Sequence, residues 1–322
     1  MIYDNIPQDR VESRKENPME NITKREFLAA SIGAGLGLTG TRRAFAQQGS
    51  AAPSNGGGRP AGNGRTPSRK AKTTKLFKSP SGFPNAIAVT PEGLWIAEQK
   101  LSGQQAVQYH LPEPKDLTEN AWLVDWNGKV LKTVATQSRN TSGMAVGGGY
   151  VWMCANAPPE GVFQVDMNSK EVSHRQIPLG PADNGGGCHG AMWHDGKLWI
   201  AALRLRGILR VDPVSWQPEF MIPFYQSQEK PRYHATAWDN GAIWQIIGND
   251  CKRYADYQPA LVKYDAATGK VLETVDFLPN SADPHGLALH DGALISCDAG
   301  IHPGWPNNDS PTSGWIFRID LI

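Results

Sequence analysis

The 322-residue chain has no excess of charge of either sign, no long apolar run and only four cysteines. Its 32 Lys and Arg residues balance 31 Asp and Glu residues. No surplus of cations is left to neutralise a phosphate backbone, so we expect no nucleic-acid partner. A run of about eighteen uncharged apolar residues is missing, so we expect no ordinary membrane-spanning helix. The chain also lacks Gly-x-Ser-x-Gly, a P-loop and His-Glu-x-x-His, which excludes the sites that depend on those motifs.

Turn-forming and aromatic residues are abundant instead. The chain has 34 Gly, 24 Pro and 11 Trp residues, a composition that favours short strands joined by many turns over long helices. All eight His and all eleven Trp residues lie in 76–322, where 19 basic residues face 25 acidic ones. We therefore look for the chemistry in that segment.

The first 46 residues predict an export signal. Thr23 to Leu28 reads TKREFL and is followed by a weakly apolar stretch and by Ala44-Phe45-Ala46. This pattern resembles a twin-arginine (Tat) signal peptide, with Lys24 in place of the first arginine. We expect export by the Tat or Sec machinery, cleavage after Ala46, a periplasmic or secreted protein, and no stable membrane insertion after cleavage. The alternative is an uncleaved membrane anchor.

Residues 47–73 are basic and rich in Gly, Pro and Ser, so they predict a disordered linker before a domain at 74–322. The four cysteines fit no CxxC metal spacing. In an exported protein two disulfides are expected, and repeat order suggests Cys154 with Cys188 and Cys251 with Cys297. Free or metal-binding cysteines are the alternative.

One sequence unit recurs five times between residues 85 and 295. A short apolar stretch leads to a turn that ends in Gly and then to a second stretch, which carries a Trp in four of the copies. The copies begin at Asn85, Ser142, His189, His234 and His285. Repeats of roughly 40 to 50 residues are typical of β-propeller blades.

Each unit also contains two further strand candidates, such as 207–212 and 219–223. Four strands per unit predict an all-β fold, a β-propeller of five units with four-stranded blades around a central channel; a degenerate sixth blade stays open. The last unit lacks an outer strand, so we expect Thr74 to Lys78 to pair with Trp315 to Asp320 and close the ring. A β-sandwich is the alternative.

Two stretches carry a family resemblance. Phe83 to Glu98 and Pro284 to Ala288 resemble the repeats of the streptogramin (virginiamycin B) lyase family and, more loosely, of gluconolactonase (SMP-30) and NHL-repeat propellers. The resemblance covers most of 76–322 as a repeat pattern, which is informative about fold and weak about reaction. Those lyases have seven blades and the gluconolactonases six, against five units here.

Antiparallel geometry brings the start of each first strand and the end of each second strand to one channel mouth. The starts include three histidines, and two of the second strands end in Glu98 and Asp298. Imidazoles and carboxylates are ligands of divalent ions. The predicted metal ligands are His189, His234, His285, Glu98 and Asp298, for an ion that could be Zn, Mg, Mn, Fe or Ca. The alternative is that these histidines are structural.

The resemblance assigns roles to some of these residues. In the lyase family the His at the repeat start and the acid after the Trp strand serve catalysis and Mg²⁺ binding, which implies such roles for His285 and Asp298. In NHL-type amidating lyases three His hold zinc, which resembles the set His189, His234 and His285. Arg232 and Tyr233, just before a repeat start, join His234 and His285 as predicted catalytic residues, and Arg139, Arg204, Arg206 or Arg232 could meet a substrate anion.

Two insertions, 99–121 and 299–313, follow second strands and are expected on the same rim. They carry His110, His302 and Trp305. His194 and His290 precede Asp-Gly turns and are expected on the opposite face. The resulting hypothesis is an exported metal-dependent lyase or hydrolase that acts on a small molecule, ester or lactone at the channel mouth. The alternatives are a non-catalytic propeller that binds a ligand, glycan or protein, and a redox propeller.

Overall fold

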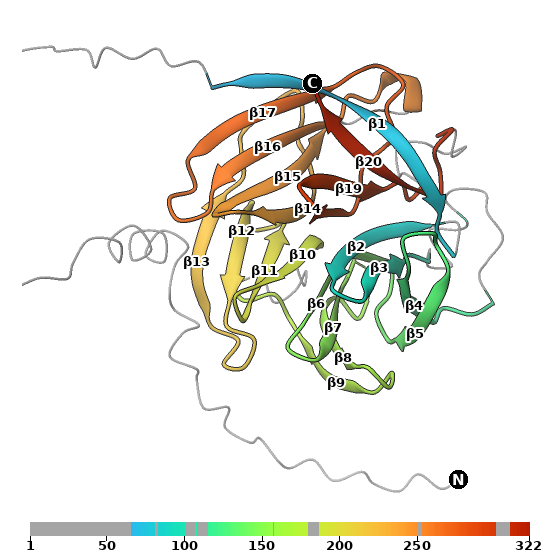
Figure 1. The fold of residues 1–322 in the computed structure, drawn as a ribbon. Helices are drawn as coiled ribbons and strands as arrows, with labels where there is room; N and C mark the ends of the chain where they lie inside the picture. Colours follow the sequence, from blue (N-terminus) through green and yellow to red (C-terminus); the bar gives the residue numbers. More distant parts are fainter. Residues whose placement is uncertain are drawn as a thin grey trace, which may run out of the picture. The chain divides into compact units, whose positions relative to one another are not determined.

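A computed structural model describes residues 66–80, 83–100, 107, 115–156, 158–179, 187–249, 251, 253–300 and 310–322. All strands of the described residues lie in the unit that spans 40–322. The predicted export signal and its cleavage site lie outside the described residues. The described part is an all-β protein with twenty strands, which Figure 1 shows in sequence colours.

The twenty strands form five groups of four neighbouring strands, one group for each sequence repeat, and pairing within each group is antiparallel. The groups are β2 (Pro84–Thr90), β3 (Gly93–Glu98), β4 (Glu119–Val124) and β5 (Val130–Thr136); β6 (Thr141–Gly147), β7 (Tyr150–Ala155), β8 (Gly161–Asp166) and β9 (Glu171–Arg175); β10 (Cys188–His194), β11 (Lys197–Ala202), β12 (Gly207–Val211) and β13 (Pro218–Pro223); β14 (Arg232–Asp239), β15 (Ala242–Gly248), β16 (Ala260–Asp265) and β17 (Val271–Phe277); and β18 (Leu287–His290), β19 (Ala293–Cys297), β20 (Trp315–Leu321) and β1 (Ser68–Lys78).

The first strand of the domain completes the last group. Thr74 pairs with Arg318 and Lys78 with Trp315, which confirms the predicted closing strand. β1 begins at Ser68, six residues before the expected start of the domain at residue 74 and within the expected linker 47–73. Residues 68–71 are ordered because they also pair, in parallel, with β17. Ala71 is fully buried there.

The Trp of each repeat packs in the core. Trp95, Trp152, Trp199 and Trp244 lie on the second strands and are only 2–3% exposed. Ile295 takes this place on β19 and is buried too. Burying rings of this size stabilises the contact between neighbouring groups, because each removes a large apolar area from water.

Small residues let the five first strands approach one another closely. The second position of each repeat is Ala86, Gly143, Gly190, Ala235 or Gly286. A Cβ on Gly143 would lie 2.9 Å from the Gly190 backbone, one on Gly190 would lie 2.7 Å from Cα of Ala235, and one on Gly286 would lie 2.7 Å from N of Ile87. We call these five residues the small-residue ring. At the three glycines of the ring, the neighbouring backbone leaves no room for a Cβ.

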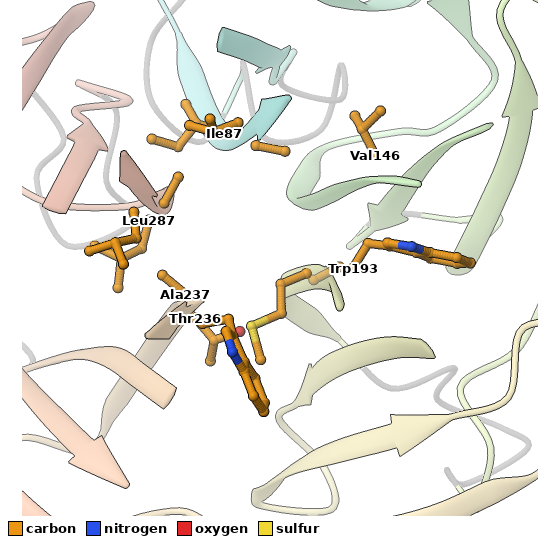
Figure 2. A pocket seen from close by; sticks show the side chains of 13 residues that line it. Ile87, Val146, Trp193, Thr236, Ala237 and Leu287 are labelled. Atoms are coloured by element: carbon orange, nitrogen blue, oxygen red, sulfur yellow. The ribbon is translucent and has the colours of Figure 1, made fainter. Parts of the chain in front are cut away.

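Beyond the small-residue ring the side chains that line the channel are mostly apolar. Figure 2 shows side chains from all five first strands, among them Ile87, Val146, Trp193 and Leu287, around a cavity of about 130 Å³. Thr236 is the one residue with a polar side-chain oxygen among those that line it. Among the described residues, no helix is long and apolar enough to cross a membrane.

The cysteines carry no disulfide bond in the described part of the chain. The sulfur atoms of Cys154 on β7 and Cys188 on β10 are nevertheless 2.6 Å apart and buried, at a contact between two neighbouring groups. The predicted Cys154–Cys188 pairing therefore joins residues that the fold already places in contact.

Candidate functional site

The backbone pairing is irregular at the start of four of the five first strands. The register between first and second strands shifts between Pro84 and Ala86, between Thr141 and Gly143, between Cys188 and Ala191, and between Tyr233 and Thr236. Each shift falls on a repeat-start residue, and such bulges re-aim side chains near functional sites. The expected meeting of strand ends is confirmed in the same pairings: Pro84 faces Glu98, for example, and Tyr233 faces Ile247.

Three pairs of neighbouring repeat-start side chains are in contact. Nδ2 of Asn85 is 3.3 Å from Oγ of Ser142. The rings of His189 and His234 stack at 5.1 Å, and those of His234 and His285 meet edge to face at 4.7 Å. Three imidazoles therefore form one cluster, as the repeat alignment predicts.

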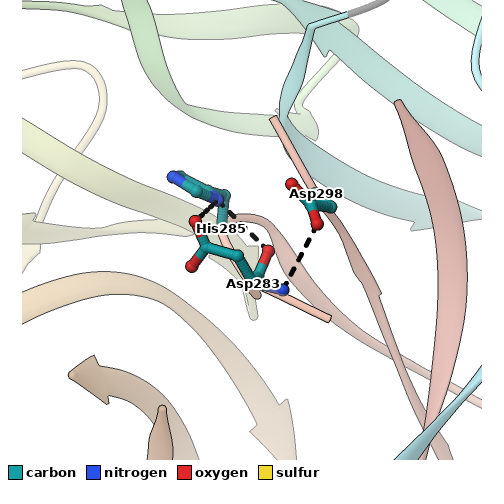
Figure 3. A group of neighbouring side chains, drawn as sticks. All are labelled: Asp283, His285 and Asp298. Carbon is teal, nitrogen blue, oxygen red and sulfur yellow. Dashed lines mark hydrogen bonds and ion pairs between the residues drawn. The ribbon is translucent and has the colours of Figure 1, made fainter. Parts of the chain in front are cut away.

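Two carboxylates complete the site beside His285. Asp283, His285 and Asp298 each present a ligand atom within 4.8 Å of the others, and all three are buried (Figure 3). Nδ1 of His285 is 3.3 Å from the carbonyl oxygen of Asp283 and 3.5 Å from its Oδ2. The carboxylate of Asp298 accepts hydrogen bonds from the backbone N of Asp283 and Gly300. We call these three residues the Asp-His-Asp group.

Hydroxyl groups from the following segment hold Asp298 in place. Oδ2 of Asp298 accepts a hydrogen bond from Oγ of Ser310 at 2.6 Å and another from the Thr312 hydroxyl. A carboxylate fixed by four donors has little rotational freedom, so its position is defined before any ligand binds.

Burial dominates the electrostatics of the Asp-His-Asp group. Burial raises the pKa of Asp283 to about 7, with the charge of Arg232 opposing the rise. Burial, together with the negative charge of Asp283, raises the pKa of Asp298 to about 6. Burial, together with the charge of Arg232, lowers the pKa of His285 to about 4. The imidazole is thus neutral at pH 7, as a metal ligand must be, and the two acids lack a full counter-charge.

Arg232 connects the histidines to the acids. Its Nη2 lies 2.8 Å from Nε2 of His234, and its guanidinium lies over the Tyr257 ring at 5.1 Å. A guanidinium can only donate, so Nε2 of His234 accepts and the neutral ring carries its proton on Nδ1. The Tyr257 hydroxyl in turn interacts with the carboxylate of Asp283.

Two of the remaining predicted site residues, His189 and Glu98, have partners outside this group. Nδ1 of His189 is 3.0 Å from the carbonyl oxygen of Tyr233, and burial lowers the pKa of His189 to about 4. Oε2 of Glu98 accepts from the backbone and side chain of Asn120, at 3.2 and 2.9 Å. Among the described residues, the set whose ligand atoms fall within 4.8 Å omits His189, His234 and Glu98.

Sequence analysis missed Asp283. It lies two residues before His285, outside the aligned repeat, and alternate residues of an extended segment face the same side. The Asp-x-His spacing of Asp283-Pro284-His285 was the available signal. His194 and His290 end their strands and stack on Trp238 and Trp126, as expected of residues at the opposite end of the channel.

His110, His302 and Trp305 lie outside the described residues. Of the insertions, residues 99, 100, 107, 115–121, 299, 300 and 310–313 are described. The expected position of the two insertions on one rim of the channel therefore stays a prediction.

Comparison with solved structures supports the fold. The chain is similar to glutaminyl cyclase from Myxococcus xanthus, with 12% sequence identity, a TM-score of 0.50, and coverage of 80% of this chain and 98% of that one. It also matches hydrazine synthase from Kuenenia stuttgartiensis at 14% identity and a TM-score of 0.43, over 76% of this chain and 64% of that one. Both are β-propeller proteins. No protein-family model matches the chain, and no curated protein matches its sequence.

These findings define a class of fold and no particular family. The propeller part of the resemblance is supported by the glutaminyl cyclase, whereas membership of the streptogramin lyase, gluconolactonase or NHL-repeat families stays a prediction. At 12% identity the likeness extends to the fold alone.

Proposed function

We propose that the chain is an exported five-bladed propeller enzyme that binds a divalent metal ion through Asp283, His285 and Asp298 and acts as a lyase or hydrolase on a small molecule. The observation that carries this proposal is the buried Asp-His-Asp group. The two buried carboxylates have the charge of Arg232 nearby but no Arg or Lys within ion-pair distance in the described part of the chain, and a dication would supply the missing positive charge. The mixed oxygen and nitrogen donors suit Zn²⁺, Mn²⁺ or Fe²⁺ better than Ca²⁺.

When bound, a divalent ion supplies Lewis acidity toward a carbonyl or phosphoryl oxygen. The protein's own residues supply position and protons. Arg232 fixes the tautomer of His234, so that His234 holds a proton at Nδ1 beside the ring of His285. Ser310 and Thr312 orient Asp298.

Metal analysis of the full chain tests the site. We expect about one equivalent of metal in the native protein and its loss in Asp283→Asn, His285→Gln and Asp298→Asn. His290→Gln is the matched control, because His290 ends the strand that follows His285 and lies at the other end of the channel. Loss of metal in folded His189→Ala would favour the three-histidine set instead, and a native protein without metal under saturating Zn²⁺ and Mn²⁺ would refute the site.

A non-catalytic binding propeller is the second candidate function. It is favoured by the depth of the group: Asp283 and Asp298 are 0% exposed and His285 is 3% exposed. Structural metal sites are closed, whereas catalytic sites keep an exchangeable position. Cobalt(II) substitution separates the two. If added azide shifts the visible bands, the position is open and the enzyme is favoured; unchanged bands favour a structural ion and the binding propeller.

A further inference from the structure

A second cavity lies next to the Asp-His-Asp group and has a different chemistry. It has a volume of about 270 Å³ and is lined by His189, Leu203, Arg206, Pro231, Arg232 and Tyr233. Arg232 belongs to both places, because it binds His234, whose ring contacts His285. A molecule in this cavity would therefore lie beside the proposed metal site.

The cavity presents positive charge and has no acidic lining residue, although the charge of Arg232 also acts on Asp283 outside it. Two of its six lining residues are arginines and none is acidic. Arg206 donates to the neutral amide oxygen of Gln226 at 2.9 Å. In the described part of the chain, no ion pair within 4.0 Å involves Arg206 or Arg232. Nη1 of Arg232 is buried and has no hydrogen-bond acceptor among the described residues.

The other lining residues favour an apolar body on the ligand. Leu203, Pro231 and the ring of Tyr233 contribute apolar surface, and Nδ1 of His189 is already engaged by the carbonyl oxygen of Tyr233. The volume is near the lower end for small-molecule sites, which matches a single-ring ligand.

We propose that this cavity binds the carboxylate of a small, largely apolar acid through Arg206 and Arg232, and that this acid is the class of molecule on which the neighbouring site acts. Guanidinium groups recognise a planar carboxylate by paired, charge-assisted hydrogen bonds. The binding step stands without the metal, whereas the step from binding to reaction rests on the proposed function.

Calorimetric titration of the full chain with benzoate at constant ionic strength tests the binding step. We expect saturable binding, little binding of the neutral analogue benzamide, and at least roughly tenfold weaker benzoate binding in Arg206→Gly and Arg232→Gln, since each removes a charged hydrogen-bond donor. Arg204→Gln is the matched control: it removes the same charge from the same turn, but Arg204 does not line the cavity.

The Arg206→Gly variant also controls for folding. Arg206 has a φ of 54°, a left-handed conformation that glycine adopts readily, so the variant should be as thermally stable as the native protein. Arg206→Lys should recover part of the affinity. Absent benzoate binding, equal binding of benzamide, or an equal loss in Arg204→Gln overturns the proposal, and binding of inorganic phosphate without benzoate overturns the carboxylate assignment.

Repeating the titration after EDTA treatment and with Asp283→Asn distinguishes the two proposals. If the native chain binds benzoate but takes up no metal ion, the result would support the anion site and refute the metal site. Metal binding without benzoate binding would do the reverse.

Discussion

Replacing Gly190 with alanine tests the small-residue ring. The added Cβ would lie 2.7 Å from Cα of Ala235 and 3.2 Å from the carbonyl oxygen of His234. Carbon atoms in contact prefer about 3.5 to 4.0 Å, so the two first strands must separate by roughly 0.8 Å. Both contacts are backbone atoms, which cannot rotate away as a side chain can.

The expected cost follows from this geometry. Forcing an extra methyl group into a packed position destabilises a protein by about 1 to 3 kcal/mol. Without a clash the same change would stabilise by about 0.4 to 1 kcal/mol, because alanine has fewer unfolded conformations than glycine. In a domain of this size each kcal/mol of destabilisation lowers the Tm by about 2 to 4 °C, so we expect the Tm to fall by roughly 2 to 12 °C.

Calorimetric unfolding measures the loss of stability. Benzoate titration measures whether the displaced strand also weakens ligand binding at the channel mouth. Because Ala235 follows His234, whose ring is contacted by Arg232, Gly190→Ala should weaken benzoate binding as well. Gly149→Ala is the control: no atom lies within 4 Å of its Cβ, and its φ of 86° costs only backbone strain of about 1 to 2 kcal/mol. It should lower Tm and leave benzoate binding intact. A Gly190→Ala variant as stable as the native protein would show that the strands do not approach as closely as the structure has them.

Three further predictions concern pH, metal and the closing strand. Burial raises the pKa of Glu119 to about 7 from 4.5, so its contribution to stability is present below pH 4.5 and lost as pH rises through 7. Measured by calorimetry and compared with Glu119→Gln, the free energy of unfolding of the native protein should fall by roughly 3 kcal/mol between pH 4.5 and 8. A difference between the two proteins that does not change with pH would contradict this. Zn²⁺ or Mn²⁺ at about 100 times its Kd should stabilise the native protein by about 2.7 kcal/mol in thermal unfolding and leave Asp283→Asn unchanged; an equal gain in both would indicate binding elsewhere. A chain that starts at residue 66 should keep the native Tm, whereas one that starts at residue 79 lacks β1 and should lose cooperative unfolding; equal Tm values would show that β1 does not close the domain.

The repeat architecture was predictable because each unit repeats the same local sequence pattern. A turn ending in Gly and a buried Trp recur at a spacing that only a few folds allow. The closing strand was predictable because the last unit lacks an outer strand. Its start was not, because residues 68–73 are basic and mostly exposed and are ordered through backbone pairing, to β20 and, at 68–71, also to β17.

Two of the three residues of the Asp-His-Asp group were predictable. Repeat alignment compares equivalent positions, so it found His285 and Asp298. It could not find Asp283, whose place beside them depends on the segment that enters the last unit and on the hydrogen bond from its backbone N to Asp298. Alignment also gave equal weight to Glu98, although Asn120 binds that carboxylate.

The small-residue ring gives the channel two unlike ends. On one side, bulged strand starts bring three imidazoles, two carboxylates and Arg232 together; on the other, regular strands present Ile87, Val146 and Leu287. Because the first strands approach one another closely at the ring, the ring separates the polar cluster from the apolar side chains of the channel. A charged ligand then has no favourable path through the channel, since desolvating a charge among aliphatic side chains is costly. Access must come from the mouth, where the arginine-lined cavity already opens beside His189.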